Sequence, residues 1–139
     1  MEGKVLLIDF SFRNGQRRLL GKIIRTGLVA EEFQVAMFDW EDFNLYLWDD
    51  KSFESTIDRA IESSRDMDVV YVHFGIQNFP RGRFNEIVER FKKTGIKVVV
   101  ESESTIGLEN ADYVFPLSVD KCKLVEELKR LCQEKNRGG

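Results

Sequence analysis

Short apolar runs alternate along the chain with segments whose apolar residues recur every three or four positions. The apolar runs predict five strands, at residues 4–9, 33–38, 68–73, 96–100 and 113–115. The first run, Lys4-Val5-Leu6-Leu7-Ile8-Asp9, is almost continuously apolar. Such a run is typical of a parallel strand that is covered by helices on both faces.

Four segments with helical periodicity follow the first, second, third and fifth strands. Their expected inward-facing residues are Leu19, Leu20, Ile23 and Ile24; Phe53, Ile57, Ala60 and Ile61; Phe84, Ile87, Val88 and Phe91; and Leu124, Val125, Leu128 and Leu131. We expect Gly27 to cap the end of the first helix, Ser52 to cap the start of the second, and Gly95 to end the third. The last helix is expected to begin near Val119, and a short helical turn is expected near residues 106–108.

This alternation of strands and helices predicts one α/β domain over residues 1–135, followed by a loose tail at residues 136–139. Right-handed crossovers give a flavodoxin-like three-layer sandwich around a five-stranded parallel sheet with strand order 2-1-3-4-5. In that order the first and third strands are neighbours. Asp9 and Ser11 are therefore expected beside His73 and Phe74.

Composition limits the kinds of partner and the compartment. The net charge of −3 comes from interspersed acids and bases, so we expect no nucleic-acid partner. No apolar run approaches ~18 residues and no signal-peptide pattern is present, so we expect no membrane span and a cytoplasmic protein. Cys122 and Cys132 fall in one expected helix, roughly 15 Å apart, which is too far for a disulfide.

The candidate chemistry centres on His73, the only histidine, because ligands of open α/β sheets gather at the carboxyl ends of the strands. Two interpretations remain open: a packing or capping histidine, or a base that reaches Ser11. Asp9 is likewise either a binding residue or a cap for a loop. The chain has neither Gly-rich phosphate-binding motif, and the turn after the first strand lacks the Ser/Thr-rich loop of a flavodoxin, so no cofactor is expected.

A long acidic and aromatic segment, Asp-Trp-Glu-Asp-Phe-Asn-Leu-Tyr-Leu-Trp-Asp-Asp, occupies residues 39–50. Long loops in compact domains are often functional. Its apolar residues either pack over a sheet edge or, with Trp40, form an interaction surface. The segment lacks the ligand spacing of a calcium loop, so we predict no metal site.

Over nearly its whole length the chain resembles response-regulator receiver domains. The resemblance rests on Val5-Leu6-Leu7-Ile8-Asp9, on Asp68-Val69-Val70-Tyr71-Val72, on Pro80 and Gly82, and on Ala111-Asp112-Tyr113-Val114-Phe115-Pro116. The chain departs from the family at the site. His73 stands where the phosphate-accepting aspartate would be, Phe10 interrupts the acidic pair that holds Mg²⁺, Glu101 or Ser102 lies near the switch hydroxyl, and no lysine precedes Pro116. The resemblance therefore implies a degenerate receiver that does not use phosphorylation at that position.

The chain also resembles TIR-like domains and nucleoside deoxyribosyltransferases. Phe10-Ser11-Phe12-Arg13 is similar to the end of their first strand, and residues 57–65 leading into Val69-Val70-Tyr71-Val72 are similar to their helix-to-strand signature. This resemblance implies that Glu86 assists cleavage of an N-glycosidic bond in NAD or a nucleoside, with help from Ser11, Arg13 and Trp40. A carboxylate suits that reaction because it stabilises oxocarbenium-like charge. The usual residues before that glutamate are absent, and Glu86 is otherwise a solvated helix residue.

The sequence favours a phosphorylation-independent receiver-like signalling or protein-interaction module, which binds a protein partner or a second copy of itself. Its expected binding residues are Asp9, Ser11, Arg13, Trp40, His73 and Phe74. The alternative is the enzyme that uses Glu86 and takes a small nucleotide ligand.

Overall fold

The computed structural model describes residues 3–9, 12–13, 16–17, 26–38, 50–74, 81–102, 110–115 and 121–138. The strands of its main sheet are β1 (Gly3–Asp9), β4 (Phe33–Met37), β5 (Val69–Phe74), β6 (Lys97–Ser102) and β7 (Tyr113–Phe115). The long helices are α2 (Asp50–Ser63), α3 (Arg81–Lys92) and α4 (Lys121–Gly138), and residues 26–30 are also helical.

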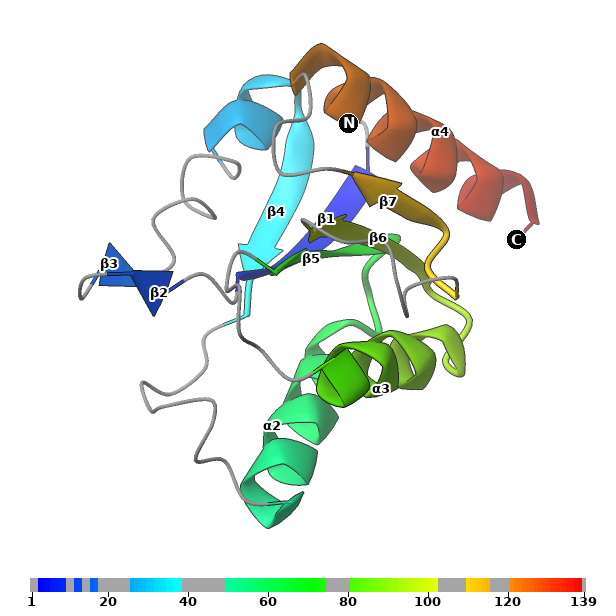
Figure 1. Ribbon diagram of the computed structural model, residues 1–139. Coiled ribbons are helices and arrows are strands. Elements are labelled where there is room, and N and C mark those ends of the chain that lie inside the picture. The colour runs from blue at the N-terminus through cyan, green and yellow to red at the C-terminus, as the bar shows by residue number, and fades with distance from the viewer. Residues whose placement is uncertain are drawn as a thin grey trace.

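The main sheet has the order β4-β1-β5-β6-β7, and every pair of neighbours in it is parallel (Figure 1). In chain order this is 2-1-3-4-5, so the predicted flavodoxin-like fold is confirmed. Helix α4 lies on one face of the sheet, and α2 and α3 lie on the other (Figure 1). The alternation of strand and helix in the sequence produces this arrangement because each parallel connection must cross over a face of the sheet.

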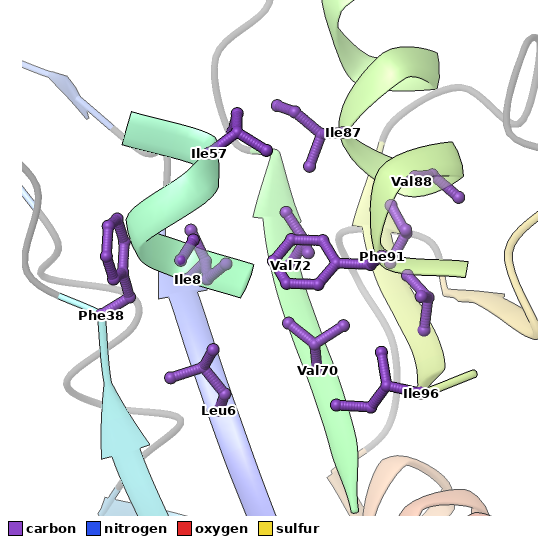
Figure 2. Packing of buried hydrophobic residues seen from close by; sticks show 13 residues of the cluster. Leu6, Ile8, Phe38, Ile57, Val70, Val72, Ile87, Val88, Phe91 and Ile96 are labelled. Atoms are coloured by element: carbon purple, nitrogen blue, oxygen red, sulfur yellow. The ribbon is translucent and has the colours of Figure 1, made fainter. Parts of the chain in front are cut away.

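Each face of the sheet has its own hydrophobic core. On the α2–α3 face, alternate residues of the central strands pack against Ile57, Ile87, Val88 and Phe91 (Figure 2). On the α4 face, the intervening residues pack against Leu124, Val125, Leu128 and Leu131. The predicted inward faces of α3 and α4 are therefore confirmed where their side chains are described.

Two strand pairs are each held at their amino ends by an aspartate, in the same way. The Asp68 backbone N–H donates to the Lys4 carbonyl over 2.8 Å, and the Lys4 N–H donates to the Asp68 carboxylate over 2.9 Å. The Asp112 N–H donates to the Val98 carbonyl over 2.8 Å, and the Val98 N–H donates to the Asp112 carboxylate over 2.7 Å. Each aspartate precedes a strand and thereby fixes the register of that strand against its neighbour.

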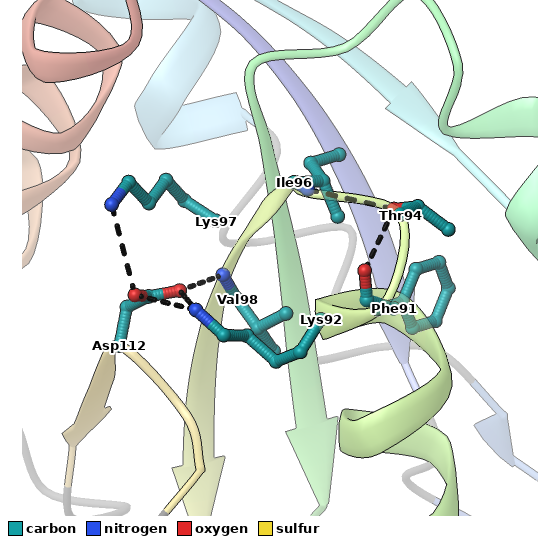
Figure 3. Close-up of polar contacts among 7 residues, drawn as sticks. All are labelled: Phe91, Lys92, Thr94, Ile96, Lys97, Val98 and Asp112. Atoms are coloured by element: carbon teal, nitrogen blue, oxygen red, sulfur yellow. Dashed lines mark hydrogen bonds and ion pairs between the residues drawn. The ribbon is translucent and has the colours of Figure 1, made fainter. Parts of the chain in front are cut away.

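Two lysine side chains also lie close to the Asp112 carboxylate (Figure 3). Lys92 Nζ, from the last turn of α3, donates to both carboxylate oxygens over 2.9 and 3.0 Å, and Lys97 Nζ lies 3.9 Å away. Asp112 thus ties α3, β6 and β7 together at one point. Hydrogen bonds in which one partner is charged are about twice as strong as neutral ones.

Helix α2 is joined to α3 by a charged pairing at their surface. The Arg90 guanidinium contacts the carboxylates of Glu54 and Asp58. Partial burial opposes the charge on Arg90, but its hydrogen bonds and charge interactions with the two carboxylates outweigh that effect and raise the pKa of Arg90. The guanidinium therefore stays charged and bridges the two helices.

Gly3 allows α4 to approach the start of β1. Its φ of +149° is one that side chains rarely adopt. A Cβ at this position would lie 2.4 Å from Sγ and 2.8 Å from Cβ of the buried Cys132. The small residue at position 3 and the small thiol at position 132 are therefore matched to each other.

Several boundaries differ from the prediction. Gly27 does not cap a helix, because it lies inside helical residues 26–30, where continuing the helix buries Leu28. Helix α2 begins at Asp50, so Ser52 is not its cap, and α4 begins at Lys121. Residues 136–138, expected to be loose, belong to α4.

The prediction also missed a small antiparallel pair, β2 (Phe12–Arg13) with β3 (Gln16–Arg17). Asn14-Gly15 lies between its strands, and that dipeptide is a hairpin signal. The predicted helical residues 19–24, the turn at 106–108 and most of the 39–50 segment lie outside the described residues.

Replacing Asp112 by alanine is expected to destabilise the protein by about 2–3 kcal/mol, because the Val98 N–H and Lys92 both lose a partner. Asp112→Asn retains an acceptor for Val98 and is expected to cost about half as much. Chemical denaturation measures both values. The control is Asp66→Ala at an exposed turn, and equal effects of Asp112→Ala and Asp66→Ala would contradict the role of Asp112.

Gly3→Ala is expected to be more destabilising than Gly95→Ala by at least ~2 kcal/mol. Both glycines have positive φ, at +149° and +88°, so both substitutions strain the backbone. Only the Cβ at position 3 meets Cys132, whereas the Cβ at position 95 has no neighbour within 4 Å. Denaturation midpoints of the two variants test the difference, and equal midpoints would rule out the contact.

Candidate functional site

Four residues stand in register across the carboxyl ends of four strands. Asp9 of β1 is the register partner of His73 of β5, His73 is the partner of Glu101 of β6, and Glu101 is the partner of Phe115 of β7. The row crosses the middle of the sheet, at the end where ligands of such sheets usually bind. The expected juxtaposition of Asp9 and His73 is present in the backbone register.

The side chains of His73 and Glu101 are in buried contact in the centre of this row, and they form an ion pair when His73 is protonated. His73 Nδ1 lies 2.6 Å from Glu101 Oε1, and the two side chains are only 2% and 7% exposed. The contact does not have the alignment of a hydrogen bond, so the attraction between the two groups is mainly electrostatic. In this low-dielectric setting the attraction is stronger than it would be at the surface.

Tyr71 supplies the second contact to the same carboxylate. Its hydroxyl donates to Glu101 Oε2 over 2.5 Å, a length typical of a hydroxyl that donates to an ionised carboxylate. Tyr71 precedes His73 by two residues on β5, so both side chains lie on the same face of the sheet. We call Tyr71, His73 and Glu101 the carboxyl-end cluster.

The cluster adjoins an apolar core through Tyr71. Tyr71 belongs to the core on the α4 face, together with Val99, Phe115 and Leu124. Burying a charge in such surroundings is costly unless an opposite charge and hydrogen bonds compensate it. Among the described groups of the cluster, the imidazole of His73 is the one that can supply a positive charge to the Glu101 carboxylate.

The second nitrogen of His73 is buried without a partner. Nε2 has no hydrogen-bond partner among the residues that the structure describes. Buried polar atoms are nearly always paired, so an unpaired one calls for an explanation. A carboxylate at Nδ1 that leaves Nε2 as the remaining polar atom is an arrangement also found at histidines that bind metals or move protons.

The other predicted site residues are only partly placed. Asp9 and Phe74 end β1 and β5, and Arg13 belongs to the separate β2–β3 pair, but their side chains lie outside the described ones. Ser11 and Trp40 lie wholly outside the described residues. Glu86 is half-buried on α3, beside the inward-facing Ile87 and Val88.

The sequence prediction did not identify Tyr71 as a site residue and considered Glu101 only beside Ser102. A signal for both was present. Glu101 follows Val98-Val99-Val100 as His73 follows the apolar residues of β5, and polar residues at the ends of neighbouring buried strands meet at one edge of the sheet. Tyr71 could be found by strand periodicity, because it is two residues before His73.

Two negative findings hold for the part of the chain that the structure describes. No three His, Cys, Asp or Glu side chains there are grouped so that they could hold a metal ion. No helix there has both the length and the apolar character needed to cross a membrane.

The fold is similar to that of known proteins, although the sequence is not. A CheY-like response regulator receiver domain from Methanospirillum hungatei JF-1 matches with a TM-score of 0.65 and 13% identity, over 99% of both chains. The sugar isomerase domain of an RpiR transcription factor from Sphaerobacter thermophilus matches with a TM-score of 0.55 and 12% identity, over 95% of this chain and 69% of that one.

These likenesses establish the fold. The chain has a receiver-like, flavodoxin-like fold. No protein-family model matches the sequence, and the search of curated proteins gave no match.

Tyr71→Phe is expected to destabilise the protein by about 1–3 kcal/mol, because the buried Glu101 carboxylate loses its hydroxyl donor. The matched control is Tyr113→Phe on β7, where the ring is half-buried, and the expected change there is within about 0.5 kcal/mol. Urea denaturation of the three proteins measures the difference. Equal stability of Tyr71→Phe and wild type would show that Glu101 does not depend on the hydroxyl.

Proposed function

We propose that this receiver-fold domain is a signalling or assembly module that binds a protein partner and does not form an aspartyl phosphate. The observation that carries the proposal is the His73–Glu101 pair at the carboxyl ends of β5 and β6. In the receiver family that this chain resembles, the phosphate-accepting aspartate occupies the position of His73.

The chemistry of the site opposes phosphoryl transfer to an aspartate. An acyl phosphate needs a free carboxylate, but β5 presents an imidazole there, and the neighbouring Glu101 carboxylate is already engaged by His73 and Tyr71. Mg²⁺ prefers carboxylate and water oxygens and is repelled by a nearby imidazolium. Asp9 is followed by Phe10, so the acidic pair of the family is incomplete.

We infer that such a domain acts by binding a partner, because binding needs no covalent modification of this site. A buried ion pair can hold the carboxyl end of the sheet in one arrangement without a covalent modification, although replacing the pair by apolar residues would often be as stable. We infer that the pair acts on the state of this end of the sheet rather than on overall stability. The partner is a protein or a second copy of the chain, and the aromatic segment at residues 39–50 is the predicted contact.

The proposal predicts that Mg²⁺ with beryllofluoride, which mimics an aspartyl phosphate, leaves the thermal unfolding temperature unchanged. A bound ligand at 100 times its dissociation constant would stabilise the fold by about 2.7 kcal/mol, which is readily detected. A shift that requires both Mg²⁺ and beryllofluoride would contradict the proposal.

Incubation with NAD or nucleosides, followed by measurement of released nicotinamide or nucleobase, separates the module from the enzyme that uses Glu86. The module predicts no release of nicotinamide or nucleobase, and it predicts that Glu86→Gln behaves as the wild type does. Release that Glu86→Gln abolishes, and that Glu89→Gln on the exposed side of the same helix retains, would establish the enzyme instead.

A further inference from the structure

The carboxyl-end cluster contains a buried negative charge whose compensation depends on one proton. Tyr71 donates to one oxygen of Glu101, and His73 Nδ1 lies at the other. The imidazole neutralises the carboxylate only while it is protonated. Histidine is the side chain that most often changes its charge between pH 5 and 8.

The elements around His73 offer no second described cation. Its own strand contributes Tyr71 and β6 contributes Glu101, while β1 places the acidic Asp9 in register with it. On the same face, β7 contributes Phe115, and the inward residues of α4 are Leu124, Val125 and Leu128. Loss of the positive charge from His73 therefore leaves a buried carboxylate with no described counter-charge.

The amino ends of the same strands are held differently. Asp68 fixes β5 against β1, and Asp112 fixes β7 against β6, through backbone hydrogen bonds and partly exposed carboxylates. These clamps contain no histidine, and the lysines at Asp112 stay charged across this pH range. A change of pH between 5 and 8 therefore acts on one end of the β5–β6 pair and spares the other.

We propose that the His73–Glu101 pair is a proton-linked latch that closes the carboxyl end of β5 and β6 when His73 is protonated and loosens it when His73 is neutral. The loosening follows because a buried carboxylate without its counter-charge is stabilised by contact with water. This inference rests on the proposed function, because it names the proton as the regulator of the same site. In the latch, the charge of His73, and not a phosphoryl group, sets the state of the carboxyl ends of β5 and β6.

Residue-resolved amide hydrogen exchange at pH 5.5 and 8.0, corrected for intrinsic rates, tests the latch. The measured quantity is a ratio of protection factors. It divides the protection of the carboxyl-end amides, at residues 72–74 and 100–102, by that of the amino-end amides, at residues 69–70 and 97–98. We expect this ratio to fall about tenfold from pH 5.5 to 8.0 in the wild type. A uniform loss of stability would lower both sets together and leave the ratio unchanged.

Two variants and a control make the test specific. In His73→Gln, which cannot be protonated, the ratio is expected to be the same at both pH values. In Tyr71→Phe, where Glu101 keeps only His73, the fall is expected to exceed that of the wild type. Glu62→Gln removes a glutamate from an exposed pair with Arg65 and is expected to respond as the wild type does.

A ratio in the wild type that is independent of pH overturns the latch, whether or not the variants fold, and so does an unchanged response in His73→Gln. Either result leaves the proposed function in place. Conversely, a thermal shift with Mg²⁺ and beryllofluoride overturns the proposed function without altering the exchange ratio measured in their absence.

Discussion

Strand β5 is hydrogen-bonded along both edges and covered on both faces, so any polar side chain that it carries must find its partner inside the protein. This constraint falls on Tyr71 and His73. Tyr71 donates to Glu101 of the neighbouring strand, whereas His73 only brings Nδ1 to 2.6 Å from the same carboxylate, and neither of its ring nitrogens has a hydrogen-bond partner among the described residues. Among the described residues, these two contacts offset the cost of burying Glu101. The proposed latch therefore centres on the His73–Glu101 pair.

The two ends of the sheet are held by different kinds of contact. At the amino end, Asp68 and Asp112 bind backbone N–H groups and set the register of two strand pairs. At the carboxyl end, an imidazole and a carboxylate are held against each other, and in the proposed latch their contact depends on the charge of the imidazole. The proposed latch would leave the amino end to hold the fold while the carboxyl end changes, as in other conformational switches.

The fold could be predicted from the sequence because the signals for it are redundant. Five apolar runs and the spacing of residues such as Ile87 and Phe91 give the elements, and the handedness of crossovers leaves few ways to arrange them. Local signals for helix ends were weaker, since burial of Leu28 extends a helix through Gly27. The site was predicted only in part. His73 is conspicuous as the single histidine, but its partner depends on the register of β5 against β6, which no local pattern encodes.

The central claim is that His73 and Glu101 stabilise each other inside the protein. A double-mutant cycle with His73→Gln, Glu101→Gln and the double variant, measured by urea denaturation at pH 6, isolates that interaction from the other effects of each substitution. We predict a coupling free energy of about 2 kcal/mol or more, because each single variant leaves a buried group without its partner. Additive effects of the two substitutions would contradict the account, since they would mean that the imidazole and the carboxylate are energetically independent.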